Sequence, residues 1–143
     1  MNKLFLYTDG GARNNPGPAA TGFVLKDEEG QVVKKGGTFL GVATNNEAEY
    51  RALIEGLQAA KEFNPNHLDC FLDSSLVVNQ LNGTFKIKEA RLRKLVFEAK
   101  ALEQELTSVR YQHIPREENK EADAILNQIL DEKTGHPQNT SLR

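Results

Sequence analysis

The sequence predicts an α/β domain in which a five-stranded mixed sheet is flanked by helices. Three segments rich in β-forming residues lie within the first 40 residues, whereas helical periodicities alternate with short apolar segments after residue 44. The resulting order is βββαβααβα, and strands that alternate with helices after initial hairpins indicate a mixed sheet with helices on its faces. The length of 143 residues fits a single domain with a substantial core.

The N-terminal part of the chain is expected to form strands. Residues 3–8 (KLFLYT) are rich in β-formers and predict the first strand. Residues 9–20 (DGGARNNPGPAA) are so dense in Gly and Pro that they predict a loop rather than a helix or strand. The second and third strands are expected at residues 21–26 and 31–40, with a bulge in the third at Gly36-Gly37.

After residue 44 the spacing of apolar residues becomes helical. The expected helices lie at residues 46–63, 76–81, 89–106 and 119–130, and the two remaining strands at residues 68–72 and 109–114. The domain is expected to span residues 1–130. The polar residues 131–143 are expected to form a flexible C-terminal tail.

The composition excludes several classes of protein. No apolar run approaches the roughly 18 residues of a membrane helix, and the segment after Met1 is too short for a signal peptide. We therefore expect a cytoplasmic protein with no membrane partner. The single Cys excludes internal disulfides and a Cys-based zinc site. The net charge of −2 argues by itself against a nucleic-acid partner, because phosphate binding usually requires a basic surface.

Four carboxylates lie at the ends of predicted elements, namely Asp9, Glu49, Asp73 and Asp123. Strand ends and helix starts gather at one edge of an α/β sheet, where such folds place their sites. If the four converge, they need a counter-charge, and all-oxygen ligands favour Mg²⁺ or Mn²⁺. Two such ions about 4 Å apart suit in-line displacement at phosphorus. The alternative is structural, because Asp9 could start a turn and Asp73 could cap a helix.

Four longer strings carry a family resemblance. They are YTDGGARNNPGPAATG (7–22), TNNEAEYRAL (44–53), FLDSSLVVNQLNG (71–83) and HIPREENKEAD (113–123). In this order they resemble the type 1 ribonuclease H family (ribonuclease HI), most closely its small bacterial and archaeal branch, over nearly all of residues 3–130. The resemblance implies a ribonuclease H-like fold and endonucleolytic cleavage of the RNA strand of RNA–DNA hybrids, leaving 3′-hydroxyl and 5′-phosphate ends.

The resemblance also assigns the acidic residues. Asp9, Glu49, Asp73 and Asp123 match the family's metal ligands and catalytic acids, and the motif selects Glu49 over the neighbouring Glu47. Asn45 and Glu49 also share a helix face at spacing i, i+4, whereas Glu47 points elsewhere. The implied mechanism uses two Mg²⁺ ions, with Mn²⁺ as a substitute. Asp9 and Asp73 bridge the ions, Glu49 and Asp123 complete one each, and water attacks the phosphate in line.

Substrate recognition requires groups that sense 2′-hydroxyls across a shallow minor groove. The family-like candidates for this task and for a DNA-strand phosphate are Gly10, Gly11, Asn15, Thr44, Asn45 and Asn46. Helix capping is the competing interpretation for Asn45 and Asn46. Ser75 stands where many family members carry Gln, which puts one 2′-hydroxyl contact in question.

Two candidates for a catalytic helper remain open at this point. His113 lies ten residues before Asp123, which matches the family's mobile His, but it also ends a predicted strand. Arg116 is the alternative, because an Arg on a loop pairs with phosphate.

The basic handle of better-known relatives is missing, since the chain contains no Trp and passes from Gly83 to the long helix in a few residues. The basic residues Lys86 and Lys88, followed by Arg91, Arg93 and Lys94, offer a substitute grip, against the alternative of a solvated helix start.

Three hypotheses for the function follow. The first is a ribonuclease H that acts alone as a monomer on RNA–DNA hybrids, with no protein partner implied. The second is a catalytically weak module that binds hybrids or double-stranded RNA with the same fold. The third is another nuclease of the same fold, because one fold supports many functions.

Overall fold

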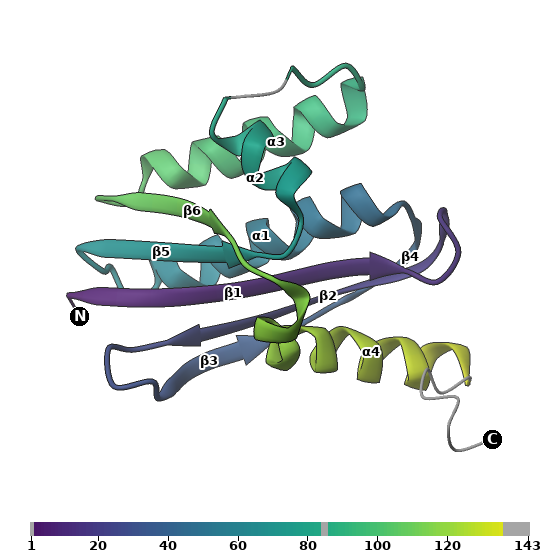
Figure 1. Ribbon diagram of the computed structural model, residues 1–143, viewed down its shortest axis with the longest axis horizontal. Coiled ribbons are helices and arrows are strands. Elements are labelled where there is room, and N and C mark those ends of the chain that lie inside the picture. The colour runs from purple at the N-terminus through teal and green to yellow at the C-terminus, as the bar shows by residue number, and fades with distance from the viewer. Residues whose placement is uncertain (1, 84–85, 136–143) are drawn as a thin grey trace.

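The computed structural model describes residues 2–83 and 86–135. Within this part the chain forms six strands, four α-helices and a short 3-10 helix (Figure 1). The strands are β1 (Lys3–Ala12), β2 (Gly17–Lys26), β3 (Val32–Gly36), β4 (Phe39–Ala43), β5 (His67–Leu72) and β6 (Val109–His113). The helices are α1 (Asn45–Lys61), α2 (Ser75–Leu81), α3 (Ala90–Gln104), η1 (Arg116–Glu118) and α4 (Lys120–Thr134).

The strands form one mixed sheet in the order β3-β2-β1-β5-β6, and β4 also pairs with β2. The β1–β2, β2–β3 and β2–β4 pairs are antiparallel, whereas β1–β5 and β5–β6 are parallel. The predicted mixed sheet with flanking helices is therefore confirmed.

The predicted third strand is split into β3 and β4, so the sheet has six strands among the described residues, five of them in one continuous order. The break lies at the predicted bulge, where the Thr38 backbone N–H donates to Thr21 Oγ1 at 2.9 Å. A Cβ at Gly37 would lie 2.4 Å from the Thr21 carbonyl oxygen, so only glycine fits this crossing. The two halves then pair with different parts of β2.

The prediction of a long loop over residues 9–20 is also wrong. The β1–β2 ladder continues from Asp9↔Gly22 to Ala12↔Ala19, which leaves only residues 13–16 between the strands. Glycines in these two strands allow helices to pack closely against them. A Cβ at Gly10 would lie 2.1 Å from the Ala48 carbonyl oxygen of α1, and one at Gly22 would lie 2.3 Å from the Ala122 carbonyl oxygen of α4.

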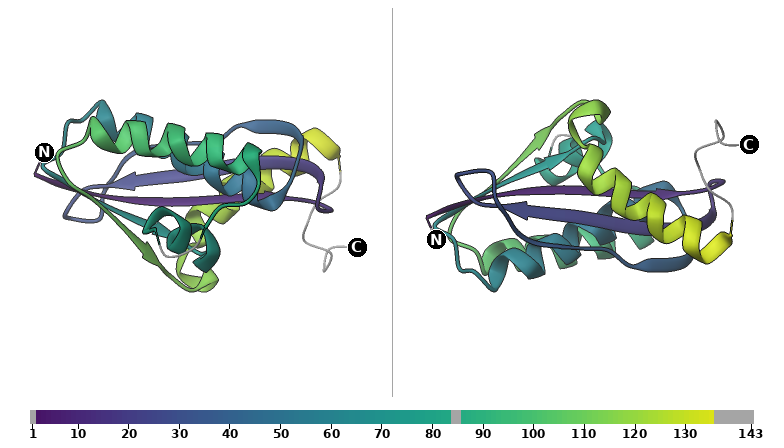
Figure 2. Two further views of the ribbon diagram at one scale, coloured as in Figure 1. Left: turned by 90° about the horizontal axis from the view of Figure 1, so that it is seen from above. Right: turned by 90° about the horizontal axis from the view of Figure 1, so that it is seen from below.

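The helices form layers on the two faces of the sheet. Figure 2 shows α1 and α3 together on one face and the start of α4 on the other. The main core lies between the sheet and α1, where Leu6, Leu25 and Leu53 are fully buried. A smaller apolar cluster holds α4 against β2 through Ala20, Leu126 and Leu130. These two packings bring the starts of α1 and α4 to the same end of β1.

The helix ends refine the predicted boundaries. α1 begins one residue earlier than expected, with Thr44 as its N-cap. α4 ends at Thr134 instead of Leu130, so the first residues of the expected tail are helical and the proposed domain boundary at 130 falls inside a helix. The rest of that tail, residues 136–143, lies outside the described residues. In the described part of the chain, no helix combines the length and apolar character needed to cross a membrane.

Candidate active site

Three acidic side chains meet where two parallel strands separate. The β1–β5 ladder ends at the pair Thr8↔Leu72, and the next residue on each side is an aspartate, Asp9 on β1 and Asp73 after β5. Glu49 reaches the same point from α1, and one carboxylate oxygen from each of these three residues lies within 4.8 Å of the others. Asp9 therefore lies inside β1, not at its end as the sequence suggested.

Glu49 is held in the cluster by the β1 backbone. The Gly10 N–H donates to Glu49 Oε1 at 2.7 Å, an approach that depends on the missing side chain of Gly10. Glu49 is buried, and its Oε2 atom has no hydrogen-bond partner among the described residues. An unpartnered buried carboxylate oxygen beside two further acids is costly unless a cation binds there.

The neighbouring Glu47 has a structural task. It forms a capping box with Thr44, in which the Glu47 N–H donates to Thr44 Oγ1 and Glu47 Oε1 accepts from the Thr44 N–H, both at 3.1 Å. Arg91 of α3 also lies 3.3 Å from Glu47 Oε1. The structure thus places Glu49 in the acidic cluster and Glu47 outside it.

The electrostatics of the cluster favour a bound cation. Burial raises the pKa of Asp9, and the nearby Glu49 and Asp73 carboxylates raise it further. Burial also raises the pKa of Glu49, although the Asp9 side chain and the Gly10 N–H oppose that rise. The atoms available to bind a metal are all carboxylate oxygens, the ligand type that hard divalent ions such as Mg²⁺ and Mn²⁺ prefer. The residues present therefore fit a divalent metal site.

Asp123 approaches the cluster from α4. It lies in the first turn of that helix and lines the same cavity, which has a volume of about 390 Å³. Its side chain is close enough to Asp9 to raise the pKa of Asp9 by hydrogen bonding. It is not one of the three acids whose oxygens lie within 4.8 Å of each other. The four predicted acids thus face one cavity, three in direct proximity and the fourth on the wall.

Asn119 is a site residue that the sequence analysis missed. Its Nδ2 atom donates to Asp73 Oδ2 at 3.0 Å and to the Thr8 carbonyl oxygen at 2.8 Å, so it ties the end of β5 to β1. The side chain is almost fully buried. The sequence offered one signal, an Asn at the predicted start of the last helix, but that position indicates a helix start and not a contact to Asp73.

The predicted substrate-binding residues gather around the turn between β1 and β2. Asn45 Oδ1 accepts from the Ala12 N–H at 2.8 Å, and the Asn45 N–H donates to Asn15 Oδ1 at 2.9 Å. Thr44 caps α1, so helix capping does not explain the Asn45 and Asn46 side chains. Asn45 and Asn46 line the cavity.

The remaining candidates fall into two groups. Gly10, Gly11 and Arg116 line the cavity together with Ser74, which caps α2. The cavity lining does not include Asn15, Thr44, Ser75, Lys86, Lys88 or His113. His113 is the exposed last residue of β6, whereas Arg116 belongs to η1. Lys86 and Lys88 are exposed and precede α3.

This sheet order, with acids where β1 and β5 separate and on two helices beside them, defines a ribonuclease H-like protein. The comparison with known families agrees, since the Reverse transcriptase-like family matches residues 7–128. The chain belongs to this family, within its type 1 ribonuclease H group.

Individual relatives support the same assignment. Ribonuclease HI of Halobacterium salinarum is 41% identical over 130 residues, which cover 91% of this chain and 65% of that protein. The crystal structure of RNase H1 from that organism superposes with a TM-score of 0.88 at 40% identity and covers 92% of this chain and 99% of that one.

A further solved structure is an RNase H1 in complex with an RNA/DNA hybrid, with a TM-score of 0.87, 36% identity and coverage of 92% of this chain and 99% of that one. The predicted resemblance is thereby confirmed. The chain spans about a third to two thirds of the length of the curated relatives that match it first.

Proposed function

We propose that this chain is a ribonuclease H that cleaves the RNA strand of RNA–DNA hybrids endonucleolytically and leaves 3′-hydroxyl and 5′-phosphate ends. The observation that carries the proposal is the carboxylate cluster of Asp9, Glu49 and Asp73, with Asp123 on the wall of the same open cavity. The solved relative in complex with an RNA/DNA hybrid supports the substrate class.

The proposed cofactor is Mg²⁺, two ions during catalysis, with Mn²⁺ as a substitute. Asp9, Glu49, Asp73 and Asp123 would hold these ions, with Asp9 and Asp73 as the proposed shared ligands and Glu49 and Asp123 as proposed ligands of one ion each. When bound, such ions lower the pKa of an attacking water and stabilise charge on the leaving oxygen. The unpartnered Oε2 of Glu49 supports its assignment as a ligand.

The chain itself supplies orientation. The Gly10 N–H fixes one oxygen of Glu49, and the Asn119 amide fixes one oxygen of Asp73, so both carboxylates are held before any ligand arrives. Preorganised groups of this kind reduce the reorganisation needed during the reaction. Arg116 lines the cavity and His113 does not, which favours Arg116 as the group that pairs with the reacting phosphate.

The proposed RNA contacts lie on the side of the cavity formed by β1 and the start of α1. Gly10, Gly11, Asn45 and Asn46 line the cavity, and Asn15 is hydrogen-bonded to the backbone of Asn45. Exposed backbone and short polar side chains suit 2′-hydroxyls in a shallow minor groove. Thr44 is the proposed contact to a DNA-strand phosphate. Ser75 lies off the cavity, and its neighbour Ser74 is better placed for a ribose contact.

The basic residues before and within the start of α3 are the proposed grip on the DNA strand. Arg91 lies 3.3 Å from Glu47, so the start of α3 sits beside the start of α1, where Thr44 caps the helix. This neighbourhood supports Lys86 and Lys88 as phosphate contacts. The proposed oligomeric state is a monomer, because all four acids come from one chain. We propose the cytoplasm as its location.

A cleavage assay tests the function. End-labelled RNA–DNA hybrid, duplex RNA and duplex DNA are each incubated with Mg²⁺, with Mn²⁺ or with a chelator. We expect cleavage of the RNA strand of the hybrid alone, and only with metal. Asp73→Asn should reduce the rate by at least about a thousandfold while the far-UV circular dichroism stays unchanged, because a shared metal ligand is lost.

Each other outcome identifies a different function. Tight binding of hybrid or duplex RNA without cleavage indicates the alternative of a binding module with the same fold. Cleavage of duplex DNA indicates another nuclease of this fold. An Asp73→Asn variant with full activity overturns the assignment of the site.

A further inference from the structure

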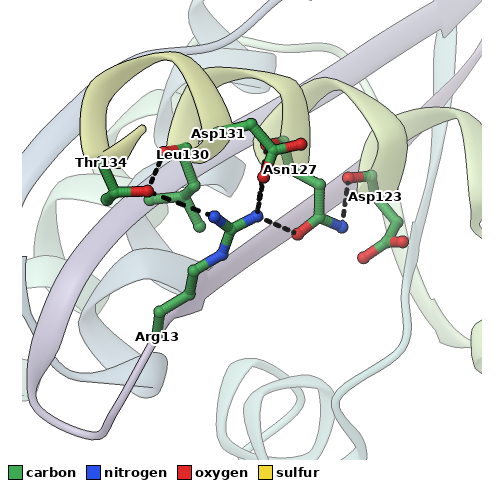
Figure 3. Close-up of polar contacts among 6 residues, drawn as sticks. All are labelled: Arg13, Asp123, Asn127, Leu130, Asp131 and Thr134. Atoms are coloured by element: carbon green, nitrogen blue, oxygen red, sulfur yellow. Dashed lines mark hydrogen bonds and ion pairs between the residues drawn. The ribbon is translucent and has the colours of Figure 1, made fainter. Parts of the chain in front are cut away.

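Arg13 lies in the turn between β1 and β2, yet its side chain is directed to α4. It lines the cavity, but its guanidinium is held against the C-terminal half of that helix (Figure 3). Nη2 lies 2.6 Å from Asp131 Oδ1 and 3.4 Å from both the backbone and side-chain oxygens of Asn127, and Nη1 lies 3.5 Å from Thr134 Oγ1. The contacts thus span two turns of α4.

The same turn is also fixed on its other side, against α1. Asn15 Oδ1 accepts from the Asn45 N–H, and the Ala12 N–H donates to Asn45 Oδ1. The turn itself is closed by the Arg13 N–H, which donates to the Pro18 carbonyl oxygen at 2.8 Å. Residues 13–16 are therefore held between the start of α1 and the end of α4.

This arrangement contributes more to order in the turn than to overall stability. The Arg13–Asp131 pair is partly exposed, with 23% and 36% of the two side chains accessible, and pairs of this exposure add little to folding stability. α4 is already held against β2 by its apolar cluster. The turn has no such apolar packing, because residues 14–16 are exposed.

Order in the turn matters for binding. A loop that is already in its bound conformation does not lose conformational freedom when a ligand arrives, so the ligand binds more tightly. A group that acts in this way changes ground-state and transition-state binding equally and therefore changes KM but not kcat.

We propose that Arg13 is a positioning residue for the RNA strand, which braces the β1–β2 turn against α4 and so holds Asn15 and Asn45 in place for the substrate. The inference rests on the proposed function. A guanidinium suits the task because its planar fork reaches three residues of α4 at once, which an ammonium does not.

The test compares hybrid cleavage by the wild type, Arg13→Met, Arg13→Lys and Asp131→Asn. Lys34→Met is the matched control, because it removes a different exposed ion pair, with Glu62, away from the cavity. We expect Arg13→Met and Asp131→Asn to raise KM about fivefold with kcat unchanged, Arg13→Lys to give an intermediate KM, and the control to match the wild type. In Arg13→Met, amide hydrogen exchange at position 13 and at Asn45 should be faster than in the wild type, measured at a temperature well below unfolding.

Three outcomes overturn the proposal. An unchanged KM in Arg13→Met shows that the brace does not serve binding. A fall in kcat with KM unchanged shows that Arg13 acts on the chemistry instead. Unchanged amide exchange shows that the turn is ordered without it. A wild type that does not cleave hybrid at all instead overturns the proposed function, and with it the substrate role of Arg13.

Discussion

Asn119 holds two parts of the site together with one side-chain amide. Its Nδ2 atom bonds both the Asp73 carboxylate and the Thr8 carbonyl, one residue before Asp9. The relative position of the two aspartates therefore depends on a residue that carries no charge and lies at the start of a distant helix. The four acids were predictable because each stands in a recognisable string. The role of Asn119 was not, since it depends on the meeting of three segments far apart in the sequence.

Replacing Asn119 with Ala is expected to lower the cleavage rate about tenfold and the free energy of unfolding by about 1–3 kcal/mol, because Asp73 loses its donor and the buried Thr8 carbonyl loses a partner. Asn119→Asp, of equal size, should lower activity further, since it places another carboxylate beside Asp73. Steady-state kinetics and denaturant unfolding measure the two effects. Asn66→Ala, which removes an exposed Asn–Asn hydrogen bond, serves as control. Full activity in the folded fraction of Asn119→Ala would limit the residue to a structural role.

At the scale of elements, the strands beside the site are longer than their composition predicts. Gly and Pro in residues 9–20 are typical of loops, but in the structure the small residues of β1 and β2 admit α1 and α4 at distances that no side chain would tolerate. Sequence periodicity identified which elements exist and in what order. It could not locate their ends here, because close packing of helix on strand and a tight turn both favour glycine.

The start of α3 offers a prediction at this scale. Replacing both Lys86 and Lys88 with Ala is expected to weaken hybrid binding about threefold to tenfold and to reduce the salt dependence of the dissociation constant, because two phosphate contacts are lost. Titrations of fluorescent hybrid at several salt concentrations measure both quantities. Lys34→Met, at an exposed ion pair between β3 and the end of α1, is the control. A salt slope equal to that of the wild type would mean that these lysines are only solvated.

At the scale of the whole molecule, the net charge of −2 conceals an uneven distribution. Setting the four acids of the site aside leaves 18 basic against 16 acidic side chains, so the rest of the chain is weakly basic. The acidic balance that argued against a nucleic-acid partner thus originates in the cavity. Without a cation, the same concentration of charge also opposes folding, since burial raises the pKa of both Asp9 and Glu49 and repulsion from Asp73 adds to the rise in each.

This opposition predicts how the stability of the metal-free protein depends on pH. The pKa of both carboxyls is raised in the folded state. Between about pH 4, the ordinary pKa of a carboxyl, and these raised pKa values, the folded protein therefore binds more protons than the unfolded chain. Their contribution to stability should therefore fall as pH rises from about 4 toward neutrality. Asp9→Asn should remove most of this slope and raise the metal-free melting temperature at pH 7 by about 3–6 °C.

The stabilisation that divalent ions give should instead increase as pH rises. Ligands must be deprotonated to bind metal, so Mg²⁺ should stabilise the wild type more at pH 8 than at pH 5.5, with release of protons on binding, and should leave Asp9→Asn nearly unchanged. Thermal melts across pH with Mg²⁺ or a chelator measure both trends without any nucleic acid. The same melts on Asp131→Asn, whose carboxylate lies at the far end of α4, should retain the wild-type slope and Mg²⁺ response. A metal-free protein whose Asp9→Asn variant is less stable than the wild type at neutral pH would show that the carboxylates are compensated by the fold itself, and the cluster would then lose its main physical reason to bind a cation.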